Sequence, residues 1–104
     1  MLSSLLALAM AMQSDTTRAS REAFTGCLRQ FVNSSLQARK TAEQFRTEYA
    51  QACTAEQTAF HAAIVRREMG MRSTRANAQE SANLEVEDAR TNFREQFEMA
   101  ATPG

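Results

Sequence analysis

The chain has 104 residues, with 12 basic and 12 acidic side chains and a formal net charge of zero. This length allows one domain at most, and the balanced charge argues against a nucleic-acid binder, which carries a basic excess on one face. Glycine and proline are scarce, with three and one residues, so the composition predicts an all-α chain.

The first segment has the organisation of an export signal. Its apolar run, residues 5–12, contains Ala9-Met10-Ala11, which is typical of a signal-peptide cleavage site. The run is too short to span a bilayer as a helix, which needs roughly twenty residues. We therefore expect a signal peptide over residues 1–11 and one helical domain over 12–104. The expected location is periplasmic or secreted, with no stable membrane span beyond the leader.

Other interpretations of this segment stay open, because no Lys or Arg precedes the apolar run. The segment can be a short apolar helix that packs on the body of a cytoplasmic protein. The true start of the chain can also lie upstream.

Residues 16–39 predict the first helix, with Ser14 or Asp15 suited to cap its N-terminus. Apolar residues recur at three- and four-residue steps along one face. They are Ala19, Ala23, Phe24, Cys27, Leu28, Phe31, Val32 and Leu36. Gly26 costs this helix roughly 1 kcal/mol relative to Ala, and close approach of a neighbouring helix would account for it.

Residues 42–69 predict the second helix, after a turn at Arg39-Lys40-Thr41. Thr41 and Gln44 have the T-x-x-Q spacing of a capping box. The apolar face of this helix consists of Phe45, Tyr49, Ala52, Cys53, Phe60, Ala63 and Ile64. Gly70 is suited to end the helix in a left-handed conformation.

Residues 74–99 predict the third helix, capped by Ser73 or Thr74. Its apolar stripe consists of Ala82, Val86, Ala89, Phe93 and Phe97. The stripe is thin near its start, so a continuous helix over 42–98 is an alternative. Three helices of similar length with short connections predict an up-down-up three-helix bundle. In such a bundle the first and third helices are parallel and can lie side by side.

The two cysteines lie at equal distances along the chain from Lys40, the centre of the first turn. An antiparallel hairpin centred there places Cys27 opposite Cys53 and Phe31 opposite Tyr49. We expect a Cys27–Cys53 disulfide, which stabilises by roughly 3–4 kcal/mol for a loop of about 26 residues in the chain-entropy relation. Two reduced, buried cysteines are the alternative.

A redox or metal role for the cysteines is less favoured. The pair lacks Cys-x-x-Cys spacing, and the sequence places neither cysteine at a helix N-terminus, where the thiol pKa is lowered. A zinc site needs further ligands, and His61 is the only histidine. We therefore expect no metal site and no cofactor.

Other charged and soft side chains form local groups without a catalytic pattern. An acidic group comprises Glu80, Glu85, Glu87 and Asp88. A basic group surrounds the joint at Gly70 and comprises Arg66, Arg67, Arg72 and Arg75. Both are typical of solvated helix faces, although the basic group can meet an acidic partner. Met69 and Met71 can form a soft apolar contact surface.

Taken together, these features predict a small exported helical protein with a structural or protein-interaction role and no enzymatic activity. A protein partner or self-association through the Ala- and Phe-bearing faces is expected, and nucleic acid is not. Two alternatives stay open, the first of them on architectural analogy alone. One is a periplasmic stress or chaperone-like protein, and the other is a cytosolic helical adaptor with reduced cysteines.

Overall fold

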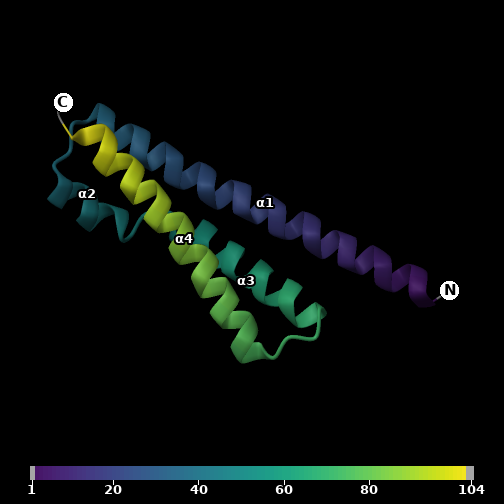
Figure 1. Cartoon of the computed structure of the whole chain (residues 1–104). Helices are drawn as coiled ribbons and strands as arrows, with labels where there is room; N and C mark the ends of the chain where they lie inside the picture. Colours follow the sequence, from purple (N-terminus) through teal and green to yellow (C-terminus); the bar gives the residue numbers. More distant parts are fainter. Residues whose placement is uncertain (1, 103–104) are drawn as a thin grey trace.

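The computed structural model describes the backbone of residues 2–102 and the side chains of residues 15–102. Its helices are α1 (Leu2–Gln37), α2 (Ala42–Tyr49), α3 (Thr54–Gly70) and α4 (Arg75–Ala101) (Figure 1). The molecule is elongated, with principal extents of 61 × 23 × 23 Å. The predicted all-α class is confirmed, but the described chain forms four helices where three were predicted.

The long helix α1 begins at Leu2 and not at the predicted Thr16. The predicted capping residue Asp15 therefore lies inside the helix, where its Oδ1 is 3.0 Å from Nη2 of Arg18. Neither Gly nor Pro occurs before Gly26, so no helix-breaking residue separates the apolar run from the amphipathic segment. The predicted leader over 1–11 lies outside the residues whose side chains are described.

The turn between α1 and α2 forms where the sequence predicts it. Arg39 takes a left-handed conformation with φ 55°. The Thr41 hydroxyl then accepts a hydrogen bond from the Gln44 backbone amide at 3.1 Å, and Oε1 of Gln44 accepts one from the Thr41 amide at 3.0 Å. The predicted capping box is confirmed.

The predicted helix over 42–69 is wrong, because the chain turns between Tyr49 and Thr54. The amide of Ala52 donates to the Tyr49 carbonyl at 3.1 Å, and Cys53 takes a left-handed conformation with φ 61°. A left-handed residue cannot continue a right-handed helix, so α3 starts afresh at Thr54. The tetrapeptide Thr-Ala-Glu-Gln at 41–44 recurs at 54–57, and this repeat is a sequence signal for the second start.

The joint between α3 and α4 forms near Gly70, as predicted, but with different geometry. Gly70 is the last residue of α3, and the left-handed position falls at Arg72, with φ 68°. Thr74 caps α4, its hydroxyl accepting from the Asn77 amide at 3.1 Å. The alternative of one continuous helix over 42–98 is therefore wrong.

The core is rich in aromatic rings and draws on all four helices. Its buried members are Phe24, Leu28, Val32, Phe45, Tyr49, Phe60, Ile64, Ala82, Val86, Phe93 and Phe97. The rings of Phe45 and Phe97 stack with centroids 3.9 Å apart, and those of Phe31 and Tyr49 lie 6.0 Å apart, as the predicted hairpin register requires. Full burial of a large apolar side chain contributes roughly 1.5–3 kcal/mol, and α2 contributes Phe45 and Tyr49.

Helices α1 and α4 lie side by side and run in the same direction. Nη2 of Arg21 is 3.0 Å from Oε1 of Glu85. Further along both helices, the guanidinium of Arg29 lies over the Phe93 ring, 5.6 Å from its centroid. The predicted neighbour relation between the first and last helices is therefore confirmed.

Candidate functional site

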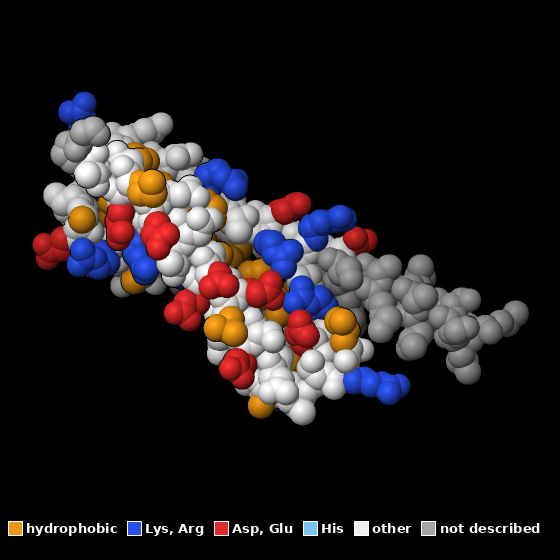
Figure 2. All heavy atoms as spheres, viewed as in Figure 1, with side chains coloured by type: hydrophobic (Ala, Val, Ile, Leu, Met, Phe, Trp, Pro, Cys, Tyr) orange, Lys and Arg blue, Asp and Glu red, His pale blue; other side chains and the backbone are white. Residues whose placement is uncertain are grey.

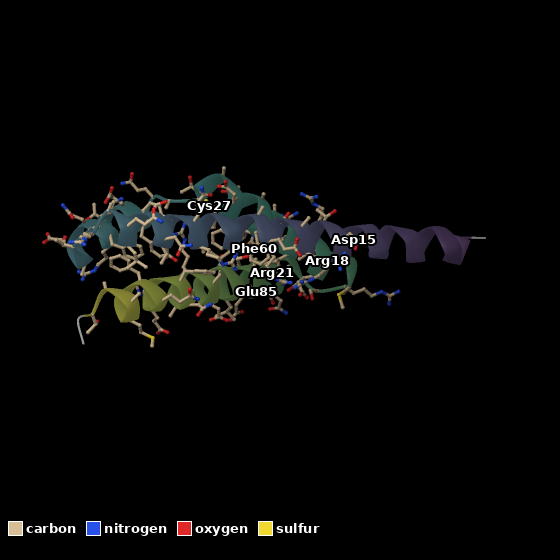
Figure 3. All side chains as sticks on the ribbon, turned by 90° about the horizontal axis from the view of Figure 1, so that it is seen from above. Asp15, Arg18, Arg21, Cys27, Phe60 and Glu85 are labelled. Carbon is tan, nitrogen blue, oxygen red and sulfur yellow. A yellow bond between two sulfur atoms is a disulfide. The ribbon has the colours of Figure 1, made fainter. Side chains whose placement is uncertain are left out.

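The cysteine pair connects the middle of α1 to the turn before α3. The Sγ atoms of Cys27 and Cys53 lie 2.06 Å apart, which is disulfide distance, and their Cα atoms lie 6.0 Å apart. Both side chains are partly exposed, and Figure 3 shows Cys27 on the middle part of α1. The predicted juxtaposition of the two cysteines is confirmed.

Cys53 has a position that the periodicity of the sequence does not reveal. It is the N-cap residue of α3, in a left-handed conformation and without a side-chain capping hydrogen bond. The expectation that neither cysteine lies at a helix N-terminus is therefore wrong. The physical reason is the turn before Thr54, which creates a helix start inside the segment predicted as one helix.

Arg90 of α4 holds this turn and is the main residue that the sequence analysis missed. Its Nη1 donates to the Tyr49 carbonyl at 2.9 Å, and its Nη2 donates to the Ala52 carbonyl at 2.5 Å. Its Nε donates to Oε1 of Gln57. The last carbonyls of a helix lack amide partners within the helix. The planar guanidinium therefore acts as a C-terminal cap for α2, supplied by another helix.

Tyr49 also contacts Arg90, through its hydroxyl and its ring. Its hydroxyl donates to the Arg90 carbonyl at 2.7 Å, and the Arg90 guanidinium lies 5.1 Å from the Tyr49 ring centroid. Burial raises the pKa of Tyr49, although the charges of Arg90 and Arg94 lower it. The one sequence signal for Arg90 is its place four residues after Val86, on the core stripe of α4.

A second network joins α1, α3 and α4 through Glu85 (Figure 3). One carboxylate oxygen of Glu85 is 3.0 Å from Nη2 of Arg21, and the other is 3.0 Å from Nη2 of Arg67. Arg67 also contacts Glu68 at 2.8 Å. Partial burial lowers the pKa of Arg67, but its hydrogen bonds to Glu68 and Glu85 and their charges raise it more. These residues therefore serve helix packing.

The four members of the predicted acidic group have different surroundings in the structure. Glu85 faces its two arginines, whereas Glu80, Glu87 and Asp88 are exposed and make no ion pair within residues 15–102. Over those same residues, no three His, Cys, Asp or Glu side chains lie close enough together to hold a metal ion.

The members of the predicted basic group also have different surroundings. Arg67 turns toward Glu85, whereas Arg66 and Arg75 border an open groove between α3 and α4 with a volume of about 510 Å³. The lining of the groove includes His61, Val65, Arg66, Met69, Arg75 and Gln79. Nε2 of His61 is 2.8 Å from Oδ1 of Asn83, so the histidine joins α3 to α4.

Comparison with known protein families, curated proteins and solved structures gives no match for this chain. Within the part of the chain that the structure describes, no helix has the length and apolar character needed to cross a membrane.

Proposed function

We propose that this chain is a small exported helical protein with a structural or protein-interaction role, and that a Cys27–Cys53 disulfide cross-links its fold. The observation that carries the proposal is the placement of Cys27 on α1 against Cys53 in the turn before α3, with their Cα atoms 6.0 Å apart. Disulfides persist in oxidising compartments and are rare in the cytosol. A bridge at this place agrees with the export signal that the apolar run at residues 5–12 predicts.

A non-enzymatic role is supported by the use of the partly buried polar groups. Arg90 and Tyr49 bond to each other and to the turn before α3. Arg67 and Glu85 bond across three helices together with Arg21. An active site needs polar groups that converge on a substrate, whereas these groups are engaged in holding helices together.

The elongated shape supports an interaction role. A body of 61 × 23 × 23 Å presents long helix faces to its surroundings. Some charged side chains of both signs are exposed and make no ion pair within residues 15–102. They are Arg66 on α3 and Arg75, Glu80, Glu87 and Asp88 on α4. Exposed charges of this kind commonly steer association between proteins.

Intact mass spectrometry of the natively expressed protein tests the proposal. We expect loss of residues 1–11 and a mass about 2 Da below the reduced value, because disulfide formation removes two hydrogens. A Cys27→Ser variant is the control, since it should lose the bridge and keep the cleavage. A full-length chain with two alkylatable thiols would contradict the proposal and favour the cytosolic adaptor.

A further inference from the structure

The outer face of α4 carries an apolar side chain among carboxylates. Leu84 is 54% exposed. Glu80, Glu87 and Asp88 lie three or four residues away and therefore surround it on one helix face, opposite the core stripe. We name Leu84 and these three acidic residues the acidic ridge. Figure 2 shows acidic side chains gathered over the N-terminal half of α4.

The groove between α3 and α4 has the complementary character. Val65 and Met69 give it an apolar surface, and Arg66 and Arg75 add two exposed guanidinium groups. No carboxylate is among its described lining residues, and neither arginine makes an ion pair within residues 15–102. We name this site the basic groove.

The acidic ridge and the basic groove are complementary in charge and in the shape of their apolar parts: the ridge protrudes and the groove is open. The ridge has one protruding apolar side chain with carboxylates on both sides, and the groove has an apolar surface with guanidiniums beside it. Arg–carboxylate pairs are among the strongest charge-assisted hydrogen bonds. We propose that two copies of this chain associate, with Leu84 of each copy in the basic groove of the other.

The occupant is a second copy because one chain carries both surfaces. Gln79 of the groove directly precedes Glu80 of the ridge, so the two surfaces lie on adjoining faces of α4. A two-fold axis between antiparallel α4 helices can then place each ridge against the partner's groove and close the assembly as a dimer.

The Ala- and Phe-bearing faces are less suited to this contact. Phe24, Phe45, Phe60, Phe93 and Phe97 are each at most 4% exposed, so they are already used in the core. The proposal rests on the interaction role proposed above and names its partner. It does not depend on export.

Sedimentation equilibrium of the purified, oxidised chain tests this pairing. We expect a dimer that weakens as salt is raised from about 0.05 to 0.5 M, because salt screens exposed charges. Leu84→Ala should weaken the dimer about three- to tenfold, through loss of apolar contact. Met99→Ala is the matched control, because Met99 is 79% exposed and lies outside both surfaces.

Charge-reversal variants provide the decisive test of this dimer. The groove variant Arg66→Glu/Arg75→Glu and the ridge variant Glu80→Arg/Asp88→Arg should each weaken dimerisation at least about tenfold, since like charges then face each other. An equimolar mixture of the two variants should restore a heterodimer to within about threefold of the original affinity. In that heterodimer the four reversed side chains face one another with opposite charges, and the natural ridge of one variant faces the natural groove of the other.

Several results would overturn the pairing. They are a monomeric natural chain at about millimolar concentration, a dimer that neither double variant weakens, and a mixture that does not re-associate although circular dichroism shows both variants helical. A monomeric chain that is processed and oxidised in the cell would refute self-association and leave the proposed export standing. A dimer formed by an unprocessed, reduced chain would refute the proposed export and leave self-association standing.

Discussion

At the scale of single residues, Gly26 occupies a helix position with no packing contact that requires glycine. A β-carbon built there meets no atom within 4 Å, so the close helix approach expected from the sequence is wrong. We expect Gly26→Ala to raise the free energy of unfolding by roughly 1 kcal/mol, as alanine is the better helix former. Urea unfolding followed by circular dichroism measures this change.

The reverse substitution at a neighbouring exposed position is the control. Ala23→Gly should lower the free energy of unfolding by a similar amount, since Ala23 lies on the exposed surface of the same helix. A loss of stability in Gly26→Ala would contradict the open space seen at this position.

Tyr49 is expected to make the free energy of unfolding depend on pH in the alkaline range. Burial raises its pKa above the ordinary 10.0, against the opposing charges of Arg90 and Arg94. A group with a higher pKa in the folded state contributes stability fully below its unfolded pKa and loses it as pH rises through the folded pKa. We therefore expect the free energy of unfolding to fall above about pH 10.

Tyr49→Phe isolates this effect. It should cost about 1 kcal/mol at pH 7, through loss of the hydroxyl bond to the Arg90 carbonyl. It should also show a smaller fall between about pH 9 and 11 than the natural chain. Equal pH slopes in the two proteins would assign the alkaline loss to other groups.

At the scale of the elements, α2 depends on contacts from elsewhere in the chain. It has eight residues, and helices this short are not stable alone in water. Arg90→Lys keeps the positive charge but loses the planar fork that binds two carbonyls and Gln57. We expect a loss of about 1–3 kcal/mol, with hydrogen exchange accelerated in α2 more than in α4.

Arg94→Lys is the matched control for that experiment. Arg94 is exposed one turn further along α4, and its closest ion-pair contact is 3.9 Å from Glu98. We expect a change within about 0.5 kcal/mol. Equal losses in the two variants would show that the fork of Arg90 has no special role.

At the scale of the whole molecule, the cysteine pair connects the longest helix to the turn that the sequence analysis missed. The bridge closes a separation of 26 residues, for which the chain-entropy relation gives roughly 3–4 kcal/mol. Cys27→Ser/Cys53→Ser should lose about that much stability while keeping helical circular dichroism. Dithiothreitol should destabilise the natural chain and leave the double variant unchanged. A natural chain insensitive to the reductant would contradict the bridge.

The features that could be predicted from the sequence alone depend mostly on near neighbours along the chain. Helix formers, two caps and the apolar periodicity predicted the all-α class, the starts at Thr41 and Thr74 and the facing cysteines. Each cap joins side-chain and backbone groups three residues apart, so it can be recognised locally.

The contacts that hold the break before α3, and the pairing of the charged side chains, depend instead on how the helices pack. The break is held by Arg90 across separations of 38 and 41 residues, and Glu85 selects its arginines from two other helices. Periodicity reports which face of a helix is apolar. It does not report which distant side chain supplies the hydrogen bonds that a turn or a charge requires, because those depend on how the helices pack.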